Sequence, residues 1–109
     1  DEGRLTIIEV TPRAVDLLIA SEPEVALRLE QKRLLAELQR ALRPLQERGR
    51  RCAISVPSKN RGAFAEYLRA AGILMAVVAD TELQGQTNLE IFTTIDASGN
   101  SLSGVSQAA

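Results

Sequence analysis

RCAISVPSKNRGAFAEYLRAAGILMAVVA, residues Arg51–Ala79, is the stretch that predicts the fold, because it is typical of a strand, a helix and a second strand. Cys52–Val56 is short, apolar and bounded by Pro57, and Ile73–Ala79 is a second apolar run that carries no charge. Short continuous apolar runs of this kind predict strands that are buried on both faces of a sheet.

The segment between these two strands predicts one amphipathic helix. Ser58 or Asn60 can cap its start, and Gly72 stands where a left-handed C-terminal cap is favoured. Its apolar side chains recur at the i, i+3, i+4, i+7 spacing of one buried stripe, and they are Phe64, Tyr67, Leu68 and Ala71. Residues 51–79 therefore predict a right-handed βαβ crossover.

The residues before this unit predict a strand and two helices. Leu5–Val10 is rich in β-branched residues and predicts a strand. Thr11 and Pro12 follow as an N-cap and a proline at the first helical position, so a short apolar helix is expected from there to about Ala20.

A longer helix is expected to start at a capping box formed by Ser21 and Glu24. Five leucines form its predicted buried stripe, and they are Leu27, Leu34, Leu38, Leu42 and Leu45. Pro44 removes one backbone donor, so it predicts a kink or the beginning of the helix end, with Gly49 as the final stop.

The last predicted strand is Leu89–Ile95, which follows a polar connector, Asp80–Asn88. Leu89, Ile91, Thr93 and Ile95 alternate with Glu90, Phe92 and Thr94, which is typical of a half-exposed strand at a sheet edge. The whole pattern predicts an α/β domain with a small mixed sheet and the element order β-α-α-β-α-β-β.

The composition excludes several kinds of site. The chain has 109 residues, a length typical of one domain, and its 13 basic and 14 acidic residues give a net charge of −1, so nucleic acid is not an expected partner. It has no His and one Cys, Cys52, which excludes His-based triads, internal disulfides and Cys-rich zinc sites. We expect no cofactor, and we expect Cys52 to pack as a small hydrophobic residue in a reducing compartment.

Residues 1–96 are expected to form the single domain, and residues 97–109, rich in Ser, Gly and Ala, to form a flexible polar tail. No stretch approaches the roughly 20 apolar residues of a membrane span, and the start lacks the pattern of a signal peptide. The absence of an initiating Met suggests a fragment or a processed product.

Ser55, Ser58 and Lys59 are the candidates for catalysis, because a desolvated Lys can act as the base for a Ser nucleophile where His is absent. Their positions favour another interpretation. Ser55 lies inside a predicted strand, and Ser58 and Lys59 stand at a predicted helix start, so a strand residue and an N-cap are favoured over a nucleophile and base.

Basic side chains cluster around the end of the long helix, at Arg40, Arg43, Arg48, Arg50 and Arg51. These five guanidinium groups can bind phosphates or the acidic surface of a partner. Cations near a helix C-terminus also interact favourably with its dipole, and this simpler interpretation is favoured. A protein contact ranks second and nucleic acid third.

Asp80 and Glu82 directly follow a predicted buried strand. Ligand-binding residues gather at the carboxyl ends of strands in α/β proteins, which makes the two carboxylates candidates for binding. Two carboxylates alone are typical of loop solvation and capping, and that interpretation is favoured.

In order, these elements resemble the C-terminal cytoplasmic subdomain of the export-gate family, the large inner-membrane component of flagellar and virulence type III secretion systems. The likeness covers residues 3–95. It consists of a strand running into a proline-started helix at residues 3–12, a strand ending in Ser55-Val56-Pro57 before a helix with Arg61, and Val77–Leu83 as the counterpart of a closing V-L-S-Y-x-E-I signature. Two details depart from the family, since Arg61 comes one residue later than usual after Pro57, and Ala79-Asp80 replaces Ser-Tyr.

The resemblance implies a non-enzymatic, ring-forming scaffold at the cytoplasmic side of an inner-membrane protein. It implies other proteins as partners, namely chaperones, substrates and export components, with membrane contact only through parts of a longer chain and homo-oligomers only in the full-length protein. A free-standing α/β module that binds a ligand or regulates an enzyme is the alternative, and a small hydrolase is a third possibility.

Overall fold

The computed structural model describes residues 4–49 and 51–97. Its strands and helices follow the predicted order β-α-α-β-α-β-β, with two additional short 3-10 helices, so the α/β fold class is confirmed. The elements are β1 (Leu5–Val10), α1 (Pro12–Ile19), α2 (Val25–Glu47), β2 (Cys52–Val56), η1 (Ser58–Asn60), α3 (Arg61–Ala70), β3 (Val77–Ala79), η2 (Asp80–Leu83) and β4 (Leu89–Ile95).

The four strands form one sheet in the order β3-β2-β1-β4. The expectation of a mixed sheet is wrong, because β1 pairs in parallel with both β2 and β4, and β2 pairs in parallel with β3. The connector after β3 returns the chain to the N-terminal ends of the strands, so β4 runs in the same direction as β1. The edge position predicted for β4 is confirmed.

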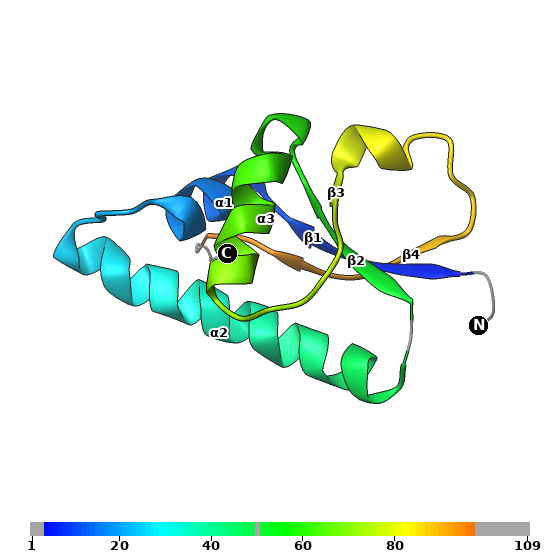
Figure 1. The fold of residues 1–109 in the computed structure, drawn as a ribbon, viewed down its shortest axis with the longest axis horizontal. Helices are drawn as coiled ribbons and strands as arrows, with labels where there is room; N and C mark the ends of the chain where they lie inside the picture. Colours follow the sequence, from blue (N-terminus) through cyan, green and yellow to red (C-terminus); the bar gives the residue numbers. More distant parts are fainter. Residues whose placement is uncertain (1–3, 50, 98–109) are drawn as a thin grey trace, which may run out of the picture.

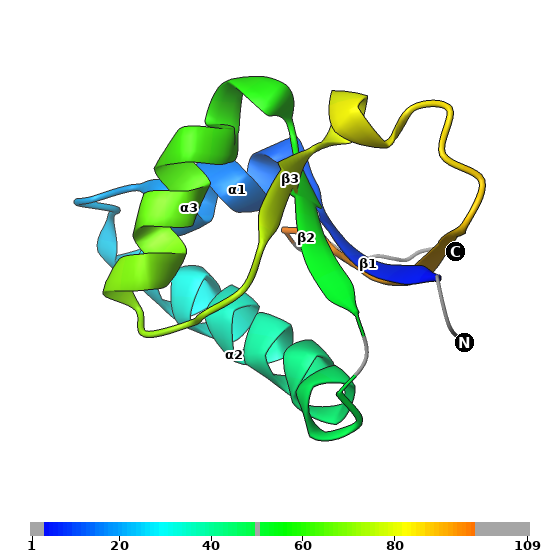
Figure 2. The ribbon, with the colours of Figure 1, turned by 45° about the vertical axis from the view of Figure 1, so that its right-hand side comes forward.

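Helices α1, α2 and α3 all lie on one face of the sheet (Figures 1 and 2). In Figure 2 the connector from η2 to β4 lies on the other side. Because successive strand residues point to opposite faces, alternate residues of the strands enter the helical layer. These are Ile8, Val10, Ile54, Val56 and Ile95, and all five belong to the buried core that also contains Leu18, Leu34, Leu38, Phe64 and Leu68.

The pairing of β4 contains an irregularity that the sequence pattern did not predict. Ile7 pairs with Ile91 while Ile8 pairs with Thr93, so Phe92 is an extra residue in β4. A bulge of this kind breaks the strict alternation of side chains. Ile91 and Phe92 are both exposed. The expectation that Leu89, Ile91, Thr93 and Ile95 share one face is wrong, because Leu89 and Ile91 pair with Leu5 and Ile7, whereas Thr93 and Ile95 pair with Ile8 and Val10 on the opposite face.

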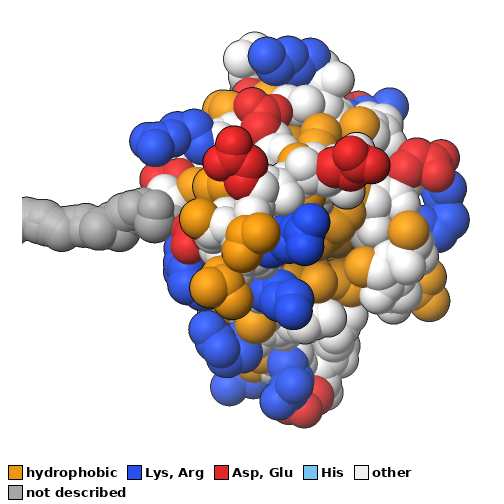
Figure 3. Space-filling view, turned by 90° about the vertical axis from the view of Figure 1, so that its left-hand side faces the viewer, with side chains coloured by type: hydrophobic (Ala, Val, Ile, Leu, Met, Phe, Trp, Pro, Cys, Tyr) orange, Lys and Arg blue, Asp and Glu red, His pale blue; other side chains and the backbone are white. Residues whose placement is uncertain are grey.

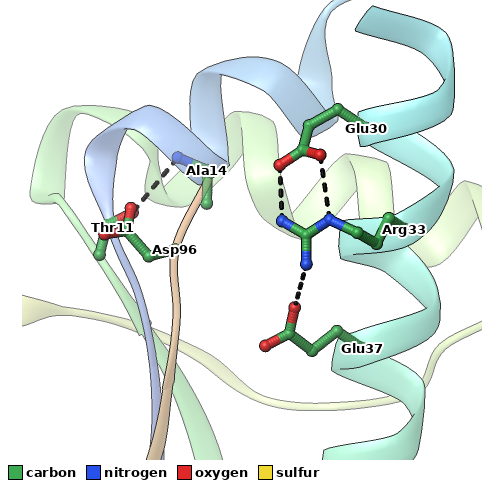
Figure 4. Close-up of polar contacts among 6 residues, drawn as sticks. All are labelled: Thr11, Ala14, Glu30, Arg33, Glu37 and Asp96. Atoms are coloured by element: carbon green, nitrogen blue, oxygen red, sulfur yellow. Dashed lines mark hydrogen bonds and ion pairs between the residues drawn. The ribbon is translucent and has the colours of Figure 1, made fainter. Parts of the chain in front are cut away.

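The start of α1 is confirmed. The Thr11 hydroxyl oxygen accepts a hydrogen bond from the backbone N–H of Ala14 at 3.3 Å, and Pro12 occupies the first turn. The same hydroxyl donates to a carboxylate oxygen of Asp96 at 2.7 Å (Figure 4). One side chain therefore caps α1 and links it to the end of β4.

The capping box predicted at Ser21 is wrong. The helix α2 begins at Val25 with Glu24 at the N-cap position, and no side chain there makes a capping hydrogen bond. Pro23 explains the difference, because the residue before a proline is disfavoured in the helical region, so Glu22 cannot form the first turn that a Ser21 cap requires.

Most of the predicted leucine stripe of α2 is confirmed, since Leu34, Leu38, Leu42 and Leu45 are buried. Leu27 is 45% exposed, so its place in the stripe is wrong. The first turns of α2 lie at one end of the molecule (Figure 1), where no part of the helical layer covers them. Pro44 lies inside the last turns, and the chain leaves the helix at Gly49, whose φ of 66° is the left-handed conformation that favours glycine.

The βαβ unit of residues 51–79 is present with different details. The strand β3 covers only Val77–Ala79, because only these residues of the predicted strand have partners on β2. Neither Ser58 nor Asn60 caps α3 with its side chain, since both belong to the 3-10 turn that leads into the helix. Gly72 has a φ of 80°, which confirms the left-handed end of α3.

The buried face of α3 is formed by Phe64 and Leu68. Tyr67 is partly buried beside them, with its ring centroid 5.7 Å from that of Phe64, whereas Ala71 is exposed. The tail predicted for residues 97–109 lies, except for Ala97, outside the described residues.

Candidate protein-interaction surface

The predicted basic residues lie on the surface around the second half of α2. Arg40 and Arg43 are exposed within the helix, Arg48 is its exposed C-cap residue, and Arg51 is exposed just before β2. Arg50 lies outside the described residues. Within residues 4–49 and 51–97, no carboxylate forms an ion pair with these four guanidinium groups. Their charges are therefore available to a partner.

Arg33, on the same helix, shows the opposite arrangement (Figure 4). Its guanidinium donates to Glu30 at 2.6 Å and 3.0 Å and to Glu37 at 3.0 Å. The hydrogen bonds that Arg33 donates to Glu30 contribute most to raising the pKa of Arg33 above its ordinary value. The charge of Arg33 is thus satisfied within α2, whereas that of Arg40 and Arg43 is not.

The candidates Asp80 and Glu82 belong to η2. A carboxylate oxygen of Glu82 accepts a hydrogen bond from the backbone N–H of Ala79 at 2.7 Å, so Glu82 caps the turn that follows β3. Asp80 is exposed beside it. The described part of the chain has no group of three or more Cys, His, Asp or Glu side chains that could hold a metal ion.

The two groups of predicted residues do not form one site. Arg51 immediately precedes β2, whereas Asp80 immediately follows β3. The strands β2 and β3 are parallel neighbours, so the N-terminal end of β2 and the C-terminal end of β3 lie at opposite ends of the strands. The basic cluster and the acidic pair are therefore separate surfaces.

The structure does not join the residues considered for catalysis. Ser55 is buried in β2, while Ser58 and Lys59 are exposed in η1. Within the described residues, no hydrogen bond connects any two of the three side chains. Ser55 occupies the strand position that the favoured interpretation gave it.

Exposed apolar side chains are a feature that the sequence interpretation missed. Val25 and Leu29 of α2 are 72% and 71% exposed, and Leu74, which follows α3, is 84% exposed. Val25 and Leu29 are four residues apart and so lie on one side of the helix. Their spacing places them off the stripe of Leu34 and Leu38, and this mismatch was the available signal. Figure 3 shows hydrophobic side chains lying among Lys and Arg side chains on that end of the molecule.

Two surface hollows lie along α2. The first, which we call the Leu35 hollow, has a volume of about 350 Å³ and is lined by Leu18, Ile19, Gln31, Lys32, Leu35 and Tyr67, with Ala20 and Ser21 at its edge. The second, the Leu42 hollow, has a volume of about 330 Å³ and is lined by Gln39, Leu42, Arg43, Gln46, Ile73 and Leu74, together with Gly72.

Gln31 builds part of the first hollow by closing the end of α1. Its side-chain amide nitrogen lies 2.9 Å from the carbonyl oxygen of Leu17, 3.2 Å from that of Leu18 and 3.1 Å from that of Ala20. The last carbonyls of a helix lack partners within the helix, so this amide satisfies groups that would otherwise need water. It also joins α1 to α2.

Burial affects two titratable groups near the helical layer. Desolvation raises the pKa of the Tyr67 hydroxyl above its ordinary value, and it also raises the pKa of the Cys52 thiol. Both groups are therefore neutral at physiological pH, and Cys52 is a poor nucleophile. The positive charges of Lys32 and Arg43 are then the only full charges on the described lining of the two hollows.

Comparison with protein-family models, with curated proteins and with solved structures found no match to this chain. Among the helices of the described residues, none combines the length and the apolar character that crossing a membrane requires.

Proposed function

We propose that this chain is a non-enzymatic protein-interaction and scaffold domain, resembling the cytoplasmic part of a type III secretion export gate that takes part in protein export. The observation that carries this proposal is the exposed side of α2. There, guanidinium groups without ion pairs in the described residues, such as Arg40 and Arg43, share one helix with the exposed apolar side chains of Val25 and Leu29.

The chemistry of this surface is that of a protein contact. Arginine is enriched among the residues that dominate binding energies at protein interfaces. Exposed apolar side chains gain free energy when a partner removes them from water, and like charges gathered on one side increase the rate of association with an oppositely charged partner. The same helix therefore offers both affinity and steering.

The non-enzymatic part of the proposal has separate support. The chain has no His, and the hydroxyls of Ser55 and Ser58 have no hydrogen bond to Lys59. A nucleophile needs a base within hydrogen-bond reach, about 2.6–3.2 Å, and this pairing is absent among the described candidates.

The element order agrees with the resemblance, since a strand leads into a proline-started helix and a long helix precedes the βαβ unit. If the chain is part of an export gate, its partners are export components or complexes of chaperones with their substrates, and it acts at the cytoplasmic side of a membrane protein. An upstream reading frame that encodes several membrane spans would support this assignment.

The experiment compares two triple variants with the same change in net charge. Replacing Arg40, Arg48 and Arg51 with Glu should abolish capture of partners, including export components, from a lysate of the source cells. Replacing Arg13, Lys59 and Arg61 with Glu is the matched control, because these residues are also exposed and lie in α1, in η1 and at the start of α3 rather than in the second half of α2. Circular dichroism should show that both variants are folded.

Equal capture by the two variants would overturn the role of the α2 surface. A panel of hydrolase substrates at high protein concentration tests the other part of the proposal. Turnover that disappears in Ser55→Ala, Ser58→Ala or Lys59→Ala would show that the chain is an enzyme.

A free-standing module that binds a small ligand is the second candidate, and the two hollows favour it. Their volumes, about 330 and 350 Å³, lie at the small end of the range for ligand sites. Thermal-shift screening with small metabolites separates the two candidates, because a specific ligand should raise the unfolding midpoint in proportion to the logarithm of its concentration once the protein is saturated.

A further inference from the structure

The Leu35 hollow and the Leu42 hollow lie on the same flank of α2. The α2 residues that line the two hollows follow one side of the helix, because successive ones are three or four positions apart or directly adjacent. They include Lys32, Leu35, Gln39, Leu42 and Arg43. Leu35 and Leu42 are two turns apart, which corresponds to about 10 Å along the helix axis. The two hollows thus have a regular spacing set by the helix itself.

Each hollow combines apolar walls with one cation. Lys32 lines the first hollow and Arg43 the second, and both side chains are exposed. Neither makes an ion pair with a carboxylate of residues 4–49 and 51–97, and no described residue that lines either hollow is acidic. A complementary ligand has two apolar side chains, one for each hollow, and a carboxylate beside each of them.

The secondary structure of the ligand follows from its surroundings. The first hollow lies among α1, α2 and α3, and the second lies between α2 and residues 72–74, which follow α3; no residue of a strand lines either hollow, so they offer no strand edge to pair with an extended peptide. Binding here must rely on side chains, as when an amphipathic helix lies in a groove. At the second hollow, the 84% exposed side chain of Leu74 adds apolar area for such a helix.

We propose that this flank of α2 binds an acidic amphipathic helix of another protein, whose apolar side chains, two turns apart, enter the Leu35 and Leu42 hollows while its carboxylates pair with Lys32 and Arg43. The proposal rests on the proposed function as an interaction domain and names the chemistry of the partner. Along the chain, Ala70 and Ala71 separate Tyr67 of the first hollow from Gly72 of the second, and both alanines are exposed and have short side chains.

The test uses a designed peptide and NMR on the isotope-labelled chain. The peptide is an Ala-based helix of about 15 residues with Leu two turns apart and Glu one turn from each Leu. A second peptide has Lys in place of each Glu, and a third carries a central Pro that breaks the helix. We expect shifts of the amide signals of Lys32, Leu35, Arg43 and Ile73 with the first peptide, and affinity about tenfold weaker with the other two.

A charge exchange makes the test specific. The double variant Lys32→Glu, Arg43→Glu should lose most of its affinity for the Glu peptide and prefer the Lys peptide. Arg13→Glu, Arg61→Glu is the matched control and should behave as the parent chain. Leu74→Ser should weaken binding without unfolding the protein, because the side chain is exposed.

Equal binding of the Glu and Lys peptides, no binding of any peptide, or shifts confined to β4 or to the connector would each overturn the inference. These outcomes are distinguishable from failure of the proposed function, because that test changes Arg40, Arg48 and Arg51 and leaves Lys32 and Arg43 intact. If the α2 triple variant loses partners while no peptide binds the flank, the interaction domain stands and the acidic helix does not.

Discussion

The two ends of α2 have similar apolar content and opposite burial. Val25, Leu27 and Leu29 are 72%, 45% and 71% exposed, whereas Leu34 and Leu38 are fully buried. Val25 and Leu29 lie off the stripe of Leu34 and Leu38, so they point away from the core. Leu27 keeps the period of that stripe, but it belongs to the first turns of α2, which pass beyond the elements that cover the second part. The apolar residues of this one helix are therefore divided between the buried core and the exposed surface.

The largest expected effect comes from the buried end. Leu38→Ala should lower the free energy of unfolding by about 2–5 kcal/mol, because it removes a fully buried side chain and leaves a cavity. Urea denaturation followed by circular dichroism measures the change. A loss below about 0.5 kcal/mol would show that the two ends of α2 do not differ as described.

Gln31 lies at the boundary between the two ends, and its side-chain amide donates hydrogen bonds to the last carbonyl oxygens of α1. Gln31→Ala should cost about 1–2 kcal/mol, because it leaves partly buried carbonyl oxygens without a protein donor. Gln31→Glu keeps the size but removes the donor, so it should cost at least as much. If the Glu variant is as stable as the parent chain, water replaces the amide and the boundary is set by packing alone.

The exposed end should respond far less. Leu29→Ala should change the free energy of unfolding by no more than about 0.5 kcal/mol, because the side chain is 71% exposed. The same denaturation experiment, run beside Leu38→Ala, gives the ratio of the two effects. A loss as large as that of Leu38→Ala would mean that this end of α2 is covered in solution.

The smallest effect is expected at Ser21. Because α2 begins at Val25 and Ser21 caps nothing, Ser21→Ala should leave stability within about 0.5 kcal/mol of the parent chain. Thr11→Ala is the contrasting variant, since Thr11 does cap α1, and it should cost about 0.5–2 kcal/mol. A larger loss of stability in Ser21→Ala than in Thr11→Ala would show that Ser21 caps α2 after all.

Elements with strong local signals were predicted well. The bounds of Leu5–Val10, Cys52–Val56 and Leu89–Ile95 agree with the structure, because proline or a helix cap ends the first two and a polar connector precedes the third. The strand predicted at Ile73–Ala79 was too long, because strand formation depends on a partner and only Val77–Ala79 have one on β2. The direction of β4 could not be predicted from local sequence patterns either, because it depends on the path of the connector between β3 and β4.

The candidate site was predicted in part. The exposure of Arg40, Arg43, Arg48 and Arg51 follows from charge, which a sequence displays directly. The capping role of Glu82 and the closure of α1 by Gln31 depend on distances across turns and between helices, which the sequence does not display. The hollows on α2 likewise arise only when distant segments meet, namely α1 and α3 at the first hollow and residues 72–74 at the second.

The hydrogen bond between Thr11 and Asp96 joins residues that are 85 positions apart, and the central strand β1 pairs with β4 over separations of 84 and 85 positions. Contacts between such distant residues form slowly, because a long loop must close before they give any stabilisation. During synthesis, β1 leaves the ribosome first and has one edge without its final neighbour until residues 89–95 have followed. We therefore expect β1 and β2 with their helices to associate early, and the docking of β4 to complete folding as the last and slowest step.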